Sequence, residues 1–287
     1  MPINSLLVPI SGTDASKAAM DVAFTVAKEL QAHIDALHVR PDSRDAVPIL
    51  GEGVSGALIE EIMDVAETEA GERAGKARAM FDEFIKRYGV AVVDGPTTGR
   101  ASASWVEVTG REDEVTTLRG RLSDATVVSR PTPETDIAAT MTLNAALFDT
   151  GRPVLVAPPG FSGSVGTRIA ISWNGSAEAA RSIGAAMPLI ERAREVVVLT
   201  AVGEVQSAPT IPDMLTYLAW HGVKATTHTL QSVNKIVGDV LLKDCAQIGA
   251  DLLVMGAYTR NRLRQMILGG VTRHVLENAT IPLFMSH

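Results

Sequence analysis

The strongest constraint on the fold of this chain is an internal repeat. An apolar run, a small polar residue, Gly and a hydroxyl residue occur in that order at two places, and two further segments also recur. The three pairs begin at Leu6 and Ile169, at Asp124 and Asp251, and at Arg152 and Ile281. Three matches in the same order indicate that one domain is duplicated within the chain. This agrees with the two domains expected of 287 residues at roughly 150 residues per domain.

The two copies differ in length. The matched segments lie 163, 127 and 129 residues apart, so the first copy holds roughly 36 extra residues, within 41–88. Gly56–Tyr88 is rich in Ala and Glu with few breakers, which predicts a long helix. Residues 158–166 are rich in Pro, Gly and Ser, which is typical of a linker. We therefore expect an N-terminal domain at 1–158 and a C-terminal domain at 167–287.

Strand and helix patterns alternate in each copy. In the second copy we expect strands at Arg168–Trp173, Val196–Val202, Ala225–Leu230, Leu252–Gly256 and Pro282–Met285, and helices at Ala177–Leu189, Ile211–His221, Ile236–Ile248 and Gly270–Asn278. Short continuous apolar strands suit a parallel sheet that is buried on both faces. The pattern predicts an α/β protein with two tandem, doubly wound, open parallel sheets of five strands each. Ligands then bind outside the carboxyl ends of the strands, after the first and fourth strand.

Composition and charge exclude several classes of protein. The net charge of −7 argues against a general nucleic-acid binder, and no apolar run is long enough for a membrane span. No secretory signal is visible at the start. Cys245 is the only cysteine, so an intrachain disulfide and a CxxC metal site are impossible, and we expect a buried thiol in a reducing compartment. These features predict a cytoplasmic protein.

The loop after the fourth strand of the second copy is a candidate phosphate site. It opens with Gly256 and closes with Gly269-Gly270, directly before a helical pattern, and Arg260, Arg262 and Arg264 lie between them. Glycine lets backbone amides approach a phosphate, and a helix N-terminus presents free N–H groups to an anion. The same residues also suit a glycine-hinged turn with solvated arginines, so the residues alone leave both readings open.

This loop, the strand before it and the last strand, which begins with Pro282, resemble the universal stress protein family. The likeness covers nearly the whole chain as two such domains in tandem. The family's ATP-binding members carry Gly, two residues, Gly, nine residues, Gly, then Ser or Thr. Gly256 and Gly269 match this pattern, whereas Thr259 replaces the second glycine and Gly270 stands at the hydroxyl position. Asn174 stands where the family usually has an aspartate after its first strand.

The resemblance implies a Rossmann-like fold of the adenine nucleotide alpha-hydrolase type and a site for ATP, with Mg²⁺ accompanying it. By position, Asn174 would contact the ribose and Val202 and Met255 the base. The phosphate contacts would come from amides of the Gly256 to Val271 loop, with Arg260 or Arg262 neutralising charge. The residues implied are Asn174, Val202, Met255, Gly256, Thr259, Arg260, Arg262, Gly269, Gly270 and Val271.

The first copy departs further from the family pattern. Its first strand ends in Ser11-Gly12-Thr13 without the aspartate, and its fourth strand is followed by Arg130-Pro131-Thr132-Pro133. Proline has no backbone N–H, so it cannot donate a hydrogen bond to a phosphate. We expect this copy to have lost nucleotide binding or never to have had it. Its role is then structural or in partner recognition.

The last strands, which begin at Pro153 and Pro282, suggest pairing between the copies. Proline at a strand start is compatible with an edge strand. The unpaired backbone groups of an edge strand can pair with a second edge strand. In the family this strand mediates contact between domains. We therefore expect an internal pseudo-dimer, with room for a homodimer through a further interface.

Several other residues allow both a structural and a functional interpretation. The Ser11–Ser16 segment superficially resembles the Ser-Gly-Gly-x-Asp-Ser loop of ATP pyrophosphatases, but a turn with Thr13 or Asp14 as helix N-cap is favoured. His274 either reaches a phosphate or is a solvated helix residue, with the second favoured. Trp173 either walls an adenine pocket or packs in the core. Asp124 and Asp251 are interpreted as turn residues at the edge away from the ligand.

No catalytic apparatus is visible in the sequence. The first hypothesis is a stress-response binding or signalling module that takes adenine nucleotide (ATP) through its C-terminal domain. The second is a nucleotide-free interaction scaffold, which the departures at Thr259, Gly270 and Asn174 favour. The third is a weak ATPase.

Overall fold

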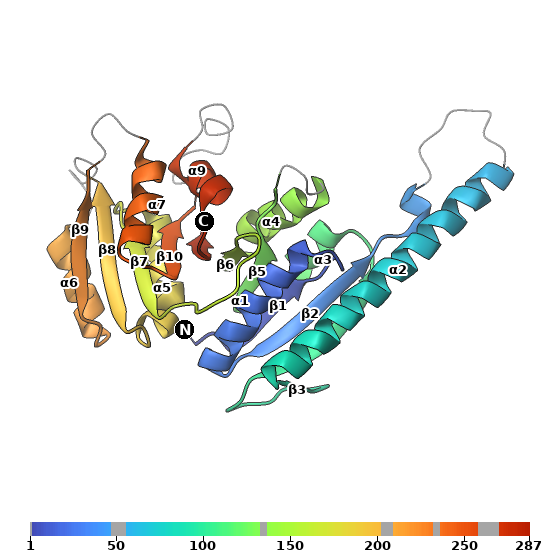
Figure 1. Ribbon diagram of the computed structural model, residues 1–287, viewed down its shortest axis with the longest axis horizontal. Helices are drawn as coiled ribbons and strands as arrows, with labels where there is room; N and C mark the ends of the chain where they lie inside the picture. Colours follow the sequence, from blue (N-terminus) through green and yellow to red (C-terminus); the bar gives the residue numbers. More distant parts are fainter. Residues whose placement is uncertain (1, 47–55, 133–136, 202–208, 232–235, 258–269) are drawn as a thin grey trace.

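A computed structural model describes residues 2–46, 56–132, 137–201, 209–231, 236–257 and 270–287. The chain forms one sheet with helices on both faces, and Figure 1 shows the two halves side by side along the long axis. None of the helices in these ranges has the length and apolar character needed to span a membrane.

The N-terminal half runs from β1 to β6. Its strands are β1 (Ser5–Pro9), β2 (His33–Arg40), β3 (Ala91–Val92), β4 (Ser102–Thr109), β5 (Ala125–Ser129) and β6 (Val154–Ala157). Its helices are α1 (Ala15–Leu30), the short 3-10 helix η1 (Ser43–Ala46), α2 (Gly56–Tyr88), α3 (Glu112–Gly120) and α4 (Ile137–Asp149). The predicted long helix is confirmed residue for residue.

The C-terminal half runs from β7 to β11. Its strands are β7 (Arg168–Ser172), β8 (Glu195–Ala201), β9 (Ala225–Leu230), β10 (Leu252–Gly256) and β11 (Leu283–Ser286). Its described helices are α5 (Ala177–Ile190), α6 (Ile211–Trp220), α7 (Val237–Gln247) and α9 (Val271–Asn278). Each predicted strand and helix of this half is present, with ends that shift by one residue at most.

The strand order confirms the duplication. The sheet reads β3-β4-β2-β1-β5-β6-β11-β10-β7-β8-β9, and within each half the strands are parallel. Leaving out the short edge strand β3, both halves have their first strand in the middle, flanked by the second and fourth. The order therefore reverses between β1 and β5 and again between β7 and β10, which are the places where ligands bind in open α/β sheets.

The two halves join edge to edge through their last strands. β11 pairs antiparallel with β6, with Phe284 opposite Leu155. The predicted pairing of the last strands is present. It joins the two predicted five-stranded sheets into one continuous sheet of 11 strands, because β3 adds a sixth strand to the N-terminal half. Because the joint is antiparallel, the carboxyl ends of the strands in the two halves point in opposite directions, which places the two prospective ligand regions far from each other.

Two layers of helices cover the sheet. One apolar cluster runs through both halves and takes in side chains of α1, α2, α5 and α6, with Phe24 and Phe284 fully buried in it. The opposite face is covered by α4, α7 and α9 in one cluster and by α3 in a smaller one. Aliphatic side chains and alanine supply most of this core, as the low aromatic share of the sequence requires.

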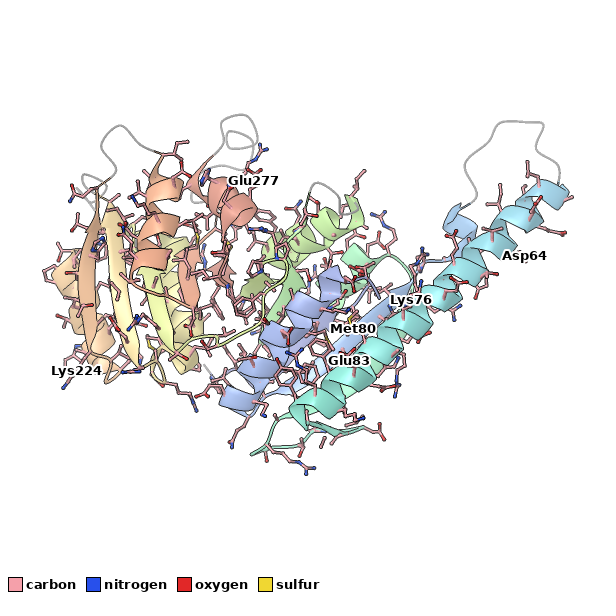
Figure 2. The ribbon with its side chains drawn as sticks, in the orientation of Figure 1. Asp64, Lys76, Met80, Glu83, Lys224 and Glu277 are labelled. Carbon is pink, nitrogen blue, oxygen red and sulfur yellow. The ribbon has the colours of Figure 1, made fainter. Side chains whose placement is uncertain are left out.

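Helix α2 extends beyond the body of the protein, as Figure 1 shows. It has 33 residues and is about 50 Å long at 1.5 Å per residue. Its fully buried side chains begin at Ala70 and continue to Phe84, so its C-terminal part packs on α1 and the sheet. Figure 2 shows Asp64 near the projecting end, while Met80 lies beside the body.

An aspartate holds the start of the first strand in each half. The carboxylate of Asp124 accepts hydrogen bonds from the backbone N–H groups of Asn4 and Ser5 at 2.8 and 3.0 Å. Asp251 likewise accepts from the N–H groups of residues 166, 167 and 168 at 2.9–3.1 Å. Both residues lie at the amino-terminal edge of their sheet, which confirms the interpretation as turn residues.

The side-chain hydrogen bond expected of the N-cap of α1 is absent. Asp14 occupies the N-cap position of α1, but its side chain makes no capping hydrogen bond. Its carboxylate lies 2.7 Å from Lys17 Nζ instead. The reason is the backbone at Asp14, which is already helical (φ −58°, ψ −25°), whereas a capping side chain needs an extended backbone at this position.

Candidate functional site

The carboxyl ends of β7 and β10 meet in the C-terminal half. These strands are parallel neighbours with Met255 opposite Ser172, so Trp173 and Asn174 leave the sheet beside Gly256. The structure therefore brings together the two loops that the sequence singled out.

The loop after β7 is a compact turn into α5. The side-chain Oδ1 of Asn174 accepts a hydrogen bond from the N–H of Ser176 at 3.1 Å. Ser176 is the N-cap of α5, and its Oγ accepts from Ala179 N at 3.1 Å. Asn174 can serve a ligand through its amide nitrogen, which is a donor, while Oδ1 keeps one further lone pair.

Gly256 is required by packing. A Cβ at this position would lie 2.6 Å from the backbone nitrogen of Ala179 and 2.9 Å from the carbonyl carbon of Glu178. The end of β10 thus touches the backbone of the first turn of α5. The glycine that opens the phosphate-loop pattern has a structural reason to be glycine, whatever binds above it.

Helix α9 begins at the other end of the same loop. Gly270 is its N-cap with an extended backbone (φ −85°, ψ 170°) and no side-chain cap, and the first turn holds no acidic residue. A Cβ on Gly270 would meet nothing within 4 Å. Val271 packs against the core cluster under α9 and fixes the helix to the sheet. The N–H groups of this first turn are suited to receive an anion.

Other candidate site residues are either buried or outside the described residues. Met255 is only 4% exposed and packs in the core. Trp173 is equally buried, and its Nε1 donates to the carbonyl of Pro209 at 3.2 Å, so it is a core residue in this structure. Val202, Thr259, Arg260, Arg262 and Gly269 lie outside the described residues.

His274 differs from the favoured reading as a solvated residue. Its side chain is 24% exposed, and Nε2 lies 2.6 Å from an oxygen of Asp239 on α7. Its ring also packs on Gly238, where a Cβ would lie 2.7 Å from the ring. The interaction of His274 is thus with α7, because Gly238 leaves room for the ring between the two helices.

The corresponding region of the N-terminal half is closed. A Cβ on Gly12 would lie 2.6 Å from the carbonyl oxygen of Arg73, so the backbone of α2 lies directly on the loop after β1. The hydroxyl of Ser11 is 2.8 Å from that of Thr13 and 2.9 Å from that of Ser16. Ser129, which stands where the other half has Gly256, donates to the carbonyl of Ala15 at 2.5 Å.

One polar cluster, formed by His33, Asp35, Ser102 and Ser104, was not predicted from the sequence. Neighbouring strands place His33 opposite Ser102 and Asp35 opposite Ser104. The signal was present as polar residues spaced two apart in both strands, which puts all four side chains on one face.

Comparison with known proteins agrees with this architecture. The sequence profile of the Universal stress protein family matches residues 201–287. These residues include β10, the loop after it, α9 and β11. Within this chain, residues 201–287 are therefore similar in sequence to the universal stress protein family.

The universal stress protein fold extends over the N-terminal half as well. A universal stress protein from Archaeoglobus fulgidus DSM 4304 aligns with 99% of this chain and 98% of its own, with a TM-score of 0.71 at 15% identity. A putative universal stress protein from Pseudomonas aeruginosa UCBPP-PA14 aligns with 98% of this chain and 92% of its own, with a TM-score of 0.56 at 14% identity.

A protein of unknown function from Pseudomonas aeruginosa PAO1 covers the same shares, with a TM-score of 0.57 at 13% identity. No curated protein sequence matched the chain. At these identities the structural matches establish the fold: two halves that each have the universal stress protein topology within one chain.

Proposed function

We propose that the C-terminal half binds an adenine nucleotide, ATP, at the carboxyl ends of β7 and β10, and that the protein acts as a binding or signalling module in a stress response. The observation that carries this proposal is the uncapped N-terminus of α9 beside the switch point of the sheet. Gly270 leaves this helix end open, and the first turn has no acidic residue to occupy its N–H groups.

The proposed contacts combine the described geometry with the family pattern. Amides of Gly270 and Val271 face the phosphates, and the helix dipole adds a partial positive charge there. The amide nitrogen of Asn174, across the junction of β7 and β10, donates to a ribose oxygen. We assign Arg260 or Arg262 to charge neutralisation, and Val202, Thr259 and Gly269 to the same site by their place in the family pattern.

Magnesium, if it accompanies the nucleotide, needs ligands from the phosphates themselves. Within the described residues, no group of three His, Cys, Asp or Glu side chains is arranged to hold a metal ion. Triphosphate oxygens and water commonly complete a Mg²⁺ shell with few protein ligands. The proposed site therefore takes the ion with ATP rather than before it.

A nucleotide-free scaffold is the second candidate. It is favoured by the N-terminal half, where α2 lies on the loop after β1 and the hydroxyls of Ser11, Thr13 and Ser16 satisfy one another. If the C-terminal half were equally closed, partner binding through surfaces such as the projecting part of α2 would be the remaining role.

Substitution of Gly270 separates the two candidates. Gly270→Asn and Gly270→Asp both supply an N-cap side chain, so both keep or strengthen α9. Only the aspartate adds a negative charge at the proposed phosphate position. We expect calorimetry to show ATP binding to the wild type and to Gly270→Asn, and much weaker binding to Gly270→Asp. Equal binding to the two variants would place the phosphates elsewhere, and no heat from the wild type would favour the scaffold.

A further inference from the structure

A cavity lies at the amino-terminal edge of the N-terminal half, away from the proposed nucleotide site. Its volume is about 540 Å³. The floor is made by His33 and Asp35 of β2 and Ser104 of β4, and a wall is made by residues 93–99, which lead from β3 into β4. The volume lies within the roughly 300–1,000 Å³ that is common for small-molecule sites.

The floor is an ordered network. Ser104 Oγ donates to Asp35 Oδ1 at 2.7 Å, and His33 Nε2 lies 3.3 Å from the same oxygen. His33 Nδ1 is 2.8 Å from Ser102 Oγ, whose residue is fully buried. The hydrogen bond from His33, together with that from Ser104, lowers the pKa of Asp35 against the opposing effect of burial. Asp35 is therefore a fixed carboxylate at neutral pH.

The other half provides an internal comparison. The aspartates that hold β1 and β7 align Ser5 with Arg168, and the strand registers then align Asp35 with Val197. Val197 is 4% exposed and packs in the core. At the same place in the same fold, one half has an ordinary core side chain and the other a carboxylate, of which 35% of the side chain is exposed.

The helix that packs on this face of the sheet is too short to cover the Asp35 carboxylate. The helix on this face, α3, has nine residues, and its Val115 packs on Leu37, two residues beyond Asp35 on β2. A partly buried carboxylate costs free energy unless its hydrogen bonds are satisfied. Among the described residues, none donates to the second carboxylate oxygen, Oδ2, so this atom can accept from a ligand.

The cavity is acidic and rich in acceptors. Asp35 and Asp94 both line it, and the described lining includes no Lys or Arg. Arg119 of α3 acts on Asp35 electrostatically without lining the cavity. The other polar groups are neutral: hydroxyls of Ser5, Thr97 and Thr98 and side-chain amides of Asn4 and Gln31. This surface repels phosphates and other anions and suits groups that carry positive charge and several N–H donors.

We propose that this cavity is a binding site for a small organic cation, an amine or a guanidinium compound, with the Asp35 carboxylate as its anchor. Asp94 supplies a second negative charge from the wall, and the threonine and amide oxygens accept the remaining N–H groups. The cluster binds and does not hydrolyse. The proton of Ser104 is directed at Asp35, and a carboxylate with a lowered pKa is a weak base for activating a nucleophile.

The test is a titration of the isotope-labelled full chain with agmatine, which carries both a guanidinium and an amine, followed by amide NMR shifts. Putrescine tests whether an amine alone suffices, and inorganic phosphate is the anionic comparison. We expect saturable shifts at residues 93–99 and around His33 and Asp35 with agmatine and none there with phosphate. Asp35→Asn keeps the shape and the hydrogen bond from Ser104, and we expect it to weaken binding about tenfold.

Two further variants keep the result decisive. Asp64→Asn on the projecting part of α2 removes the same charge far from the cavity and should bind as the wild type does (Figure 2). Asp35→Val installs the residue type of the other half, so it should fold and lose binding. Absence of saturable shifts with both amines, unchanged affinity of Asp35→Asn, or equal weakening by Asp64→Asn would each overturn the proposal. None of these results bears on nucleotide binding, which lies in the other half.

Discussion

Replacement of Gly256 by alanine tests whether this glycine is needed for packing. The added Cβ would lie 2.6 Å and 2.9 Å from backbone atoms of Ala179 and Glu178, whereas ordinary contacts start near 3.4 Å. Backbone atoms of α5 cannot turn aside as a flexible side chain can, so β10 and α5 must move apart by several tenths of an ångström. Such overpacking costs roughly 1–3 kcal/mol of unfolding free energy. At about 2–4 °C per kcal/mol, we expect Tm to fall by roughly 2–12 °C.

The matched control is Gly71→Ala, the same chemical change in α2. A Cβ on Gly71 would meet nothing within 4 Å, and the residue lies inside a helix. Alanine there should raise the unfolding free energy by roughly 0.5–1 kcal/mol. Thermal unfolding followed by circular dichroism measures both variants without nucleotide. If Gly256→Ala unfolds at the temperature of the wild type, the close packing of β10 on α5 is wrong and the glycine serves the ligand alone.

Three further outcomes follow from the structure. Asp251→Ala removes the acceptor of three backbone N–H groups and should lower the unfolding free energy in urea by about 1.5–3 kcal/mol, while Asp64→Ala on exposed α2 should leave it unchanged. Cys245 is 1% exposed, and burial raises its pKa to about 12, so a thiol reagent should label it only after unfolding. Because the unfolded thiol ionises at about pH 8.5, the unfolding free energy should fall as pH rises above that value. Cys245→Ala should flatten this dependence of the unfolding free energy on pH. An unchanged dependence would contradict the burial of the thiol as its cause. Phe284→Ala, at the joint of the two halves, should cost about 3–5 kcal/mol in the same urea assay, and a loss below 1 kcal/mol would mean that the joint is loosely packed.

Periodicity and repetition were sufficient to predict most of the fold. The apolar runs of β7 and β10 and the breaker-free stretch of α2 each express one physical preference, which the structure follows. The pairing of β6 with β11 was also foreseen, from the prolines at the strand starts. Local sequence did not predict the short strand β3, since two residues at an edge carry no periodic signal.

The site was harder to predict, because its residues depend on contacts between elements. Gly256 must be glycine because a Cβ there would collide with α5, a helix that begins 79 residues earlier in the chain at Ala177. For Trp173 and His274 the sequence allows two interpretations each, and only tertiary packing decides between a structural and a ligand role. The polar network around Asp35 requires the register of β2 and β4, which the sequence alone did not provide.

The proposed function requires that the C-terminal half binds ATP and that the N-terminal half does not. Native mass spectrometry of the full chain, purified gently and then titrated with ATP, counts bound nucleotides directly. We expect one adenine nucleotide per chain at saturation, lost in Gly270→Asp and kept in Gly270→Asn. No bound nucleotide, or two per chain, would contradict it.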